Sequence, residues 1–187
     1  MSDKLGKLCG IDEAGRGPIA GDLVMAGCIL HEEIEDLNDS KKLTEKKRET
    51  LYEIIIKKST YHIVKISPKE IDDIGISACI KKGLIEIMKK LPSTDYLFDG
   101  NSNFGVTNLP TMIKADGKIA EVSAASIIAK VTHDRDILEE AKKYPDYQFE
   151  KHKGYGTALH VEMIKKHGYC KIHRRSYKLK ALQATLF

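Results

Sequence analysis

The sequence has no apolar run long enough to cross a membrane and no low-complexity tract. A bilayer-spanning helix needs roughly 18 or more consecutive apolar residues, and no stretch approaches that length. Residues 1–4 have no apolar segment behind them, so they are not the start of a secretory signal. These absences exclude an integral membrane protein, and we expect a soluble, cytoplasmic protein.

Cysteine is scarce and its positions are widely separated. Cys9, Cys28, Cys79 and Cys170 form no Cys-x-x-Cys pair. Zinc sites and disulfide frameworks depend on closely spaced or regularly repeated cysteines. The sequence therefore predicts reduced thiols in or near the core, and neither a zinc site nor a disulfide framework.

Internal repeats and long linkers are also absent. The 187 residues, 42% hydrophobic and 31% charged, suit one domain over residues 1–187, with 178–187 as a flexible or partner-binding tail. The net charge of +4 is unevenly spread, because residues 150–180 hold nine Lys/Arg and only two acids. Clustered basic residues bind polyanions by releasing counterions from phosphates. A solvated basic surface is the alternative interpretation.

Hydrophobic periodicity and punctuation predict an alternation of strands and helices. Thr44 precedes an apolar stripe that includes Leu51 and Ile55, which is typical of a helix capped by a threonine side chain. The pattern predicts strands at 7–13, 23–30, 61–66, 96–98 and 111–114, and helices at 44–58, 76–91, 123–142 and 158–166. This order indicates an α/β fold.

Two adjacent acids, Asp12 and Glu13, end the first predicted strand. Neighbouring side chains on a regular strand point to opposite faces, so both can serve one site only if the strand bends. Gly15 and Gly17 supply that freedom, because glycine tolerates backbone angles that other residues avoid. The alternative is a turn whose acids face water.

Two further acids lie at positions where burying a charged carboxylate would cost free energy. Asp99 directly follows an apolar strand, and the ends of strands in α/β sheets are where clefts form; the alternative is a turn-forming aspartate. Asp134 continues the apolar stripe of Ile127 and Val131, where a carboxylate costs several kcal/mol unless it is paired or bound to metal. Asp136 lies about 200° further round the helix and is expected on the surface.

Carboxylates without cysteine or a clear histidine set indicate a hard cation, magnesium (Mg2+) or manganese (Mn2+). Two such ions about 4 Å apart can activate a water and stabilise the leaving oxygen in phosphodiester cleavage. No side chain needs to act as the nucleophile.

The run from Gly10 to Pro18, GIDEAGRGP, resembles the opening motif of the ribonuclease HII family. Three further blocks match the family in the same order: DSKKL at 39–43, SAASIIAKV at 123–131 running into Asp134, and HKGYGT at 152–157. A weaker fifth block is HRRSY at 173–177. The ordered set spans nearly the whole chain.

The resemblance implies a ribonuclease H-like fold, with a mixed five-stranded sheet flanked by helices and a helical C-terminal section. It implies that the metal-binding catalytic set is Asp12, Glu13, Asp99 and Asp134. In the family, the positions of Gly15, Arg16 and Gly17 surround the ribonucleotide and detect its 2′-hydroxyl, and the position of Tyr155 stacks at the ribo-to-deoxyribo junction. Lys41 and Lys42 are expected to contact phosphates, unless one of them only caps a helix.

The sequence departs from the family pattern at three places. Ala115 stands where the family usually has glycine, in Lys-Gly-Asp; His133 stands where it has arginine, and Tyr177 where it has phenylalanine. The change at His133 puts one phosphate contact in doubt. The opening motif fits the sister type, ribonuclease HIII, poorly.

The last residues resemble the short tail by which bacterial replication proteins dock into the sliding clamp. The matching positions are Gln183, Leu186 and Phe187. A tail that ends in two large apolar residues is explained by a partner's groove, or by folding back onto the protein's own core. We expect a monomer.

The function that these features indicate is an endonuclease for the RNA strand of RNA/DNA hybrids. It would also cut on the 5′ side of ribonucleotides embedded in duplex DNA and leave a 3′-hydroxyl. A nuclease of related fold that acts on DNA junctions would keep the acids without needing the Gly-Arg-Gly run or Tyr155. A non-catalytic nucleic-acid or sliding-clamp adaptor would not need the acids.

Overall fold

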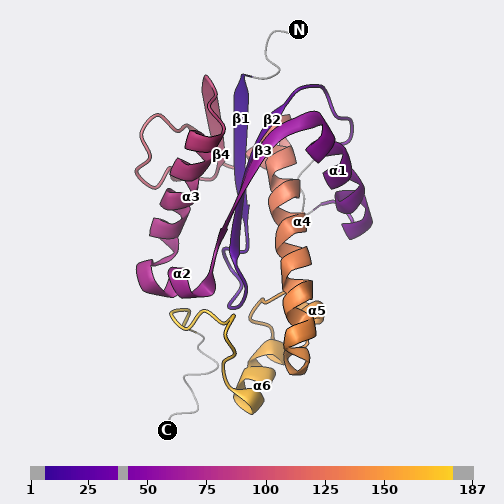
Figure 1. Cartoon of the computed structure of the whole chain (residues 1–187), viewed down its shortest axis with the longest axis vertical. Coiled ribbons are helices and arrows are strands. Elements are labelled where there is room, and N and C mark those ends of the chain that lie inside the picture. Colours follow the sequence, from indigo (N-terminus) through magenta and orange to yellow (C-terminus); the bar gives the residue numbers. More distant parts are fainter. Residues whose placement is uncertain (1–6, 38–41, 179–187) are drawn as a thin grey trace.

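The computed structural model describes residues 7–37 and 42–178, and places a mixed five-stranded sheet at the centre of the molecule (Figure 1). The strand order is β3-β2-β1-β4-β5. β1 is antiparallel to β2 and parallel to β4, β2 is antiparallel to β3, and β4 is parallel to β5. The strands are β1 (Leu8–Ala14), β2 (Leu23–Leu30), β3 (Ser59–Ile66), β4 (Asp95–Asp99) and β5 (Thr111–Met112). The predicted mixed sheet of an α/β fold is confirmed.

Helices cover both faces of this sheet. In Figure 1, α1 and α4 lie on one side, α2 and α3 lie on the other, and α5 and α6 lie beyond one end. The helices are α1 (Glu45–Lys58), α2 (Pro68–Ile74), α3 (Ile76–Lys90), α4 (Ala120–Lys143), α5 (Phe149–His152) and α6 (Ala158–His167), with 3-10 turns η1 (Ala115–Gly117) and η2 (Pro145–Tyr147). None of the helices in the described ranges is both long and apolar enough to span a membrane.

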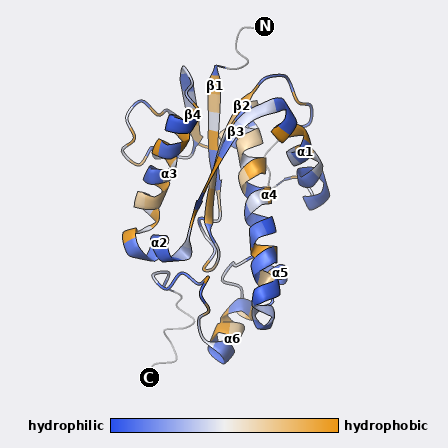
Figure 2. Ribbon diagram, in the orientation of Figure 1, coloured by the Kyte–Doolittle hydropathy of each residue, from blue (hydrophilic) through white to orange (hydrophobic). Residues whose placement is uncertain are grey.

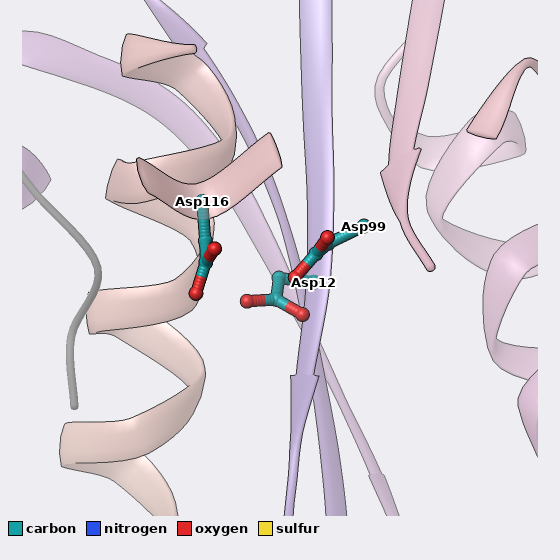
Figure 3. A group of neighbouring side chains, drawn as sticks. All are labelled: Asp12, Asp99 and Asp116. Carbon is teal, nitrogen blue, oxygen red and sulfur yellow. The ribbon is translucent and has the colours of Figure 1, made fainter. Parts of the chain in front are cut away.

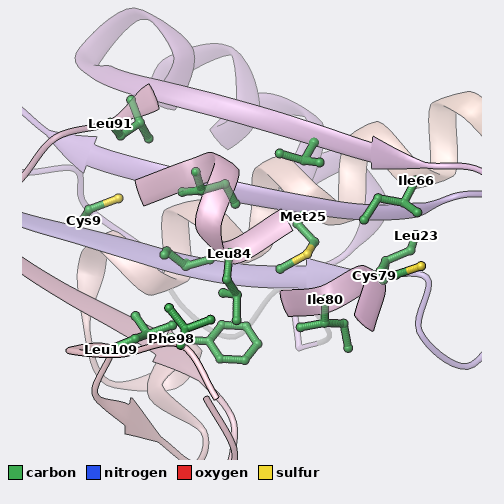
Figure 4. Packing of buried hydrophobic residues seen from close by; sticks show 14 of the residues in the cluster. Cys9, Leu23, Met25, Ile66, Cys79, Ile80, Leu84, Leu91, Phe98 and Leu109 are labelled. Carbon is green, nitrogen blue, oxygen red and sulfur yellow. The ribbon is translucent and has the colours of Figure 1, made fainter. Parts of the chain in front are cut away.

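The strand β2 shows why the sheet needs cover on both faces, since all eight of its residues are buried. Side chains alternate between the faces of a strand. Leu23 and Met25 therefore pack with α3 in one cluster (Figure 4), while Val24 and Ala26 pack with α1 and α4 in another. In Figure 2 the apolar colour gathers on the central strands and on the upper part of α4 beside them, whereas the lower part of α4 is mostly hydrophilic.

The helix α4 approaches β1 most closely at Gly10. A Cβ at this position would collide with the backbone of Glu121 and Val122. Glycine thus lets the first turn of α4 lie directly on β1. This contact fixes the register of α4 along the strand, and with it the position of every later side chain on that face of the helix.

Local signals predicted most helix boundaries. Thr44 caps α1 as expected, because its side chain accepts the backbone N–H of Lys47 at 3.2 Å. The short helix α2 was not predicted. Its start follows the same rule, with the Ser67 side chain accepting from Glu70 and Pro68 in the first turn. α4 begins at Ala120, three residues before the predicted start.

A chain of hydrogen bonds through two buried histidines connects the C-terminal section. The backbone N–H of Cys170 can only donate, so Nδ1 of His173 accepts from it at 2.9 Å. The proton of His173 then lies on Nε2, which donates to Nε2 of His160 at 3.0 Å. His160 in turn donates from Nδ1 to the carbonyl of Tyr155 at 2.9 Å. All four ring nitrogens are used only while both rings are neutral.

We predict that acid weakens this section. Burial lowers the pKa of both His160 and His173 from 6.5 to about 4. Below pH 6.5 these histidines bind protons in the unfolded chain but stay neutral in the folded chain until the pH approaches 4. The free energy of unfolding therefore falls as the pH drops from 6.5 toward 4. Urea unfolding at pH 6.5 and pH 5 should show this loss.

The variant His160→Gln should lose less stability than the wild type over the same pH interval. A matched control is His31→Gln, because His31 is exposed and lies at the far end of β2. The control should keep the wild-type dependence on pH. Equal losses in the wild type and His160→Gln would contradict the role assigned to the histidine chain.

Candidate metal centre and nucleic-acid cleft

Asp12 lies on β1 at the interface with α4, and its side chain is buried. Its carboxylate accepts the backbone N–H of Glu13 at 2.7 Å and hydrogen-bonds the side chain of Ser126 on α4. The contact between α4 and β1 at Gly10 brings Ser126 to this position. A strand end and a helix face therefore hold the carboxylate in one orientation.

Two further aspartates converge on Asp12 (Figure 3). Asp99 is the last residue of β4, the parallel neighbour of β1, and its Oδ1 accepts the backbone N–H of Ala115 at 3.0 Å. That bond draws the turn η1 toward the strand end, and Asp116 lies on this turn. One carboxylate oxygen from each of Asp12, Asp99 and Asp116 lies within 4.8 Å of the other two.

The three carboxylates repel one another in a site that excludes most water. Burial raises the pKa of Asp12 well above its ordinary 3.8, and the charges of Glu13 and Asp99 raise it further. A divalent cation between the oxygens would offset this repulsion and stabilise the ionised forms. Oxygen-only ligands suit magnesium or manganese rather than zinc, so the donor set fits the expected metal.

Glu13 and Asp12 line the same cavity, which has a volume of about 490 Å³. The Oε1 atom of Glu13 lies 3.7 Å from the guanidinium of Arg16. The strand β1 ends at Ala14, and Gly15 follows with φ +84°. The chain therefore turns just after the two acids, while β1 stays paired with β2 through Asp12 and Glu13. Glu13 is not part of the group that Asp12 forms with Asp99 and Asp116.

The structure does not bring Asp134 into the group that contains Asp12. Asp134 lies eight residues after Ser126 on α4, which is about 12 Å along the helix axis. It is buried as expected, but its Oδ1 accepts from Lys130 at 2.7 Å and lies 3.1 Å from Nδ1 of His133. Burial raises the pKa of Asp134, and these two partners outweigh that effect, so the pKa lies below 3.8.

Among the described residues, the place expected for Asp134 is taken by Asp116. The charge of the buried Asp134 is compensated, as its position in the apolar stripe predicts, but the compensation comes from an ion pair with Lys130 in the same helix. The signal for Asp116 was the Asp-Gly pair shortly before the long helix. Its position depends on Lys114, which adopts the left-handed conformation with φ +58°. Ala115 does not, so the turn does not require the glycine usual at that position.

The residues expected to detect a ribonucleotide line the same cavity as Asp12 and Glu13, whereas Asp99 and Asp116 are not among its lining residues. Its lining includes Gly15, Arg16, Gly17 and Tyr155 together with Asp12 and Glu13. A Cβ at Gly17 would lie 3.7 Å from the ring of Tyr155, so the turn and the aromatic ring are direct neighbours. Tyr155 is 44% exposed, which leaves part of its ring accessible.

Two cations of this cavity were not predicted. Arg48 on α1 and Lys130 on α4 both line it. Nη1 of Arg48 donates to the carbonyl of Leu43 at 2.6 Å. Lys42 is exposed and is not among the lining residues. Lys41 and the tail residues Gln183, Leu186 and Phe187 lie outside the described residues.

Comparison with known proteins identifies the family of the chain. A family model described as Ribonuclease HII matches residues 9–180. The chain is 58% identical over 188 residues to the ribonuclease HII of a Sulfurovum species, with 100% of each chain covered. It is 58% identical over 177 residues to that of Aliarcobacter butzleri, with 94% of this chain and 92% of the relative covered.

A solved structure also has the same fold. The complex of PCNA and RNase HII from Archaeoglobus fulgidus contains a chain that superposes with a TM-score of 0.81 at 29% identity. The match covers 93% of this chain and 96% of that chain. The expected ribonuclease H-like fold is confirmed.

We predict that metal affinity depends on Asp116 and not on Asp134. Loss of a direct ligand should cost at least the roughly 10- to 100-fold that is typical of loss of an outer hydrogen-bond partner. Calorimetric titration with Mn2+ should therefore show at least about tenfold weaker binding for Asp116→Asn. The matched variant Asp134→Asn should bind Mn2+ as the wild type does, and the opposite ranking would contradict the grouping.

Proposed function

The chain belongs to the ribonuclease HII family, whose members are metal-dependent endoribonucleases of the RNase H type, and from this premise we propose how it selects and cuts its substrate. The proposed substrates are duplex DNA with embedded ribonucleotides and RNA/DNA hybrids. The chain would cut the phosphodiester on the 5′ side of a ribonucleotide and leave a 3′-hydroxyl. The observation that supports this is the single cavity lined by Asp12, Glu13, the Gly15–Gly17 turn and Tyr155.

Asp12, Glu13, Asp99 and Asp116 are the proposed ligands for magnesium or manganese. Bound as a pair, such ions lower the pKa of the attacking water and stabilise the leaving oxygen. The protein's own contribution is to hold the carboxylates close together and partly dry. The hydrogen bonds to Asp12 and Asp99 from backbone N–H groups and from Ser126 fix their orientation.

Recognition of the ribonucleotide would use backbone groups of the glycine turn. The 2′-hydroxyl is the group that distinguishes RNA from DNA at a given site. A glycine backbone can approach it closely, and the accessible ring of Tyr155 can pack against a neighbouring sugar. Lys130 and Arg48 line the cavity and can contact phosphates on either side of the bond that is cut.

The ion pair between Lys130 and Asp134 gives the fourth predicted acid a different function. Asp134 holds the ammonium of Lys130 at 2.7 Å, and Lys130 lines the cavity although Asp134 does not. An ammonium group that is already held in place loses less conformational entropy when it binds a phosphate. We assign Asp134 to positioning Lys130 and not to binding the metal.

The biological role that fits this specificity is removal of RNA primers or of misincorporated ribonucleotides. The solved relative from Archaeoglobus fulgidus is in complex with PCNA. By analogy, the tail with Gln183, Leu186 and Phe187 would dock into the sliding clamp of this organism. Attachment to the clamp would place the enzyme on newly made DNA.

A cleavage assay tests the proposed specificity. With magnesium or manganese, the wild type should cut a DNA duplex that carries one ribonucleotide, on its 5′ side, and leave the all-DNA duplex intact. Asp12→Asn should abolish cleavage, because it removes a central ligand. Asp73→Asn is the matched control, since Asp73 forms an exposed ion pair with Lys69, and it should keep wild-type activity. Equal cleavage of both duplexes would refute specificity for ribonucleotides.

The tail prediction needs a separate measurement. Deleting residues 183–187 should remove affinity for the sliding clamp and leave cleavage of a short free duplex unchanged. Surface plasmon resonance with immobilised clamp measures the first, and the cleavage assay measures the second. Unchanged clamp affinity in the deletion variant would end the proposed docking.

A further inference from the structure

We propose that Arg174 and Tyr177 are positioning residues that hold the Gly15–Arg16 turn in the conformation in which it reads a ribonucleotide. The proposal rests on the proposed function of that turn. The two residues belong to the segment that follows α6, far from the turn in the sequence, and we refer to them together as the C-terminal brace.

Arg174 is 1% exposed, yet its guanidinium contacts backbone carbonyls rather than a carboxylate. Nη2 donates to the carbonyl of Gly15 at 2.6 Å and to that of Gly21 at 2.8 Å. Nε also donates to Gly21, at 3.0 Å, and Nη1 donates to Arg16 at 3.3 Å. Among the described residues, Arg174 forms no ion pair within 4.0 Å.

A buried arginine with no carboxylate in direct contact is a costly way to stabilise a fold, and the charges of Asp22 and Asp72 act on Arg174 only from beyond ion-pair distance. The planar guanidinium, however, offers five N–H donors in a fixed arrangement. Here this arrangement engages both ends of the 15–21 loop at once. The contacts therefore suit a residue that fixes the shape of the loop.

Tyr177 completes the contact at Arg16. Its hydroxyl donates to the carbonyl of Arg16 at 2.7 Å and accepts from Nη1 of Arg174 at 3.2 Å. The guanidinium carbon of Arg174 lies 5.2 Å from the centre of the Tyr177 ring. The family pattern described above has phenylalanine at this position, which would lack the hydroxyl and its hydrogen bonds.

The backbone around the brace is itself fixed to the loop. The N–H of Arg174 donates to the carbonyl of Ile19 at 2.8 Å, and the N–H of Gly21 donates to the carbonyl of Ile172 at 2.9 Å. Ala20 and His173 form an antiparallel bridge between these bonds. The side chains of the brace therefore start from an anchored backbone and reach the part of the loop that lies beyond it.

The orientation of these carbonyls determines where the N–H groups of the turn point. In a planar trans peptide, the C=O and the N–H point in opposite directions. With the carbonyls of Gly15 and Arg16 turned toward Arg174 and Tyr177, the N–H groups of Arg16 and Gly17 point away from the brace. They are then available to the oxygen of a substrate hydroxyl, beside the cavity that these residues line.

Without the C-terminal brace, few contacts would restrict the conformation of the Gly15–Arg16 turn. Gly15 has φ +84°, and glycine reaches many other conformations at low cost. The Arg16 side chain is exposed, with its guanidinium carbon 5.5 Å from the centre of the Phe104 ring. A turn that must order itself on binding loses affinity, so loosening it should raise KM for a ribonucleotide substrate.

The test compares Tyr177→Phe with the control Tyr61→Phe. Tyr177→Phe should fold, because the family pattern has phenylalanine at that position. Tyr61 is an exposed tyrosine on β3, far from the turn. Two quantities are measured: the NMR order parameters of the backbone N–H groups of Arg16 and Gly17, and KM and kcat on the single-ribonucleotide duplex. One net hydrogen bond corresponds to about a fivefold effect. We expect lower order parameters at these two residues and about fivefold higher KM in Tyr177→Phe, with kcat and the control unchanged.

Arg174→Lys should give larger changes of the same kind. If it does not fold, Tyr177→Phe alone decides. Unchanged order parameters and unchanged KM in Tyr177→Phe would overturn the proposal, and so would a loss of global stability with no selective change at residues 16–17. If the wild type fails to cut at a single ribonucleotide, the proposed function fails, and the order parameters alone decide whether the brace orders the turn.

Discussion

Mutual repulsion among three aspartates is the constraint around which the rest of the molecule is arranged. Asp12, Asp99 and Asp116 come from a strand, a neighbouring parallel strand and a 3-10 turn, yet their carboxylate oxygens lie within 4.8 Å of one another. Such a cluster opposes folding unless a cation binds, and the surrounding structure must hold it in place. Pairing of β1 with β4, the packing of α4 at Gly10 and the bond from Ala115 to Asp99 all serve that purpose. The three close carboxylates destabilise the fold, and a metal bound between them would offset that loss.

The contrast with Asp134 shows how the surroundings of an acid decide its function. Both Asp12 and Asp134 are buried at the α4 interface. Asp134 has Lys130 and His133 beside it, and its pKa lies below the ordinary value. Burial raises the pKa of Asp12, and the charges of the acids beside it raise it further. A carboxylate whose charge is already balanced has little to gain from a metal, whereas one surrounded by like charge has much to gain.

Analysis of the sequence predicted the fold and most of the residues now placed at the candidate site, and the residues that it missed have physical explanations. Strand ends and glycine spacing led to Asp12, Asp99 and the turn at 15–17, because these signals are local. Asp116 was not predicted, because its position depends on the left-handed conformation of Lys114 and on the hydrogen bond from Ala115 to Asp99, 16 residues apart in the sequence. The C-terminal brace was not predicted for a similar reason, since the carbonyls that Arg174 binds, those of Gly15 and Gly21, lie more than 150 residues away in the sequence. Long-range contacts of this kind leave no periodic pattern.

Anomalous diffraction from crystals grown with manganese tests the central claim most directly. The account predicts a manganese peak at coordination distance from Asp12, Asp99 and Asp116 together, with the ion pair of Lys130 and Asp134 intact beside it. A peak bound by Asp134, or well-ordered carboxylates with no peak between them at saturating manganese, would contradict it.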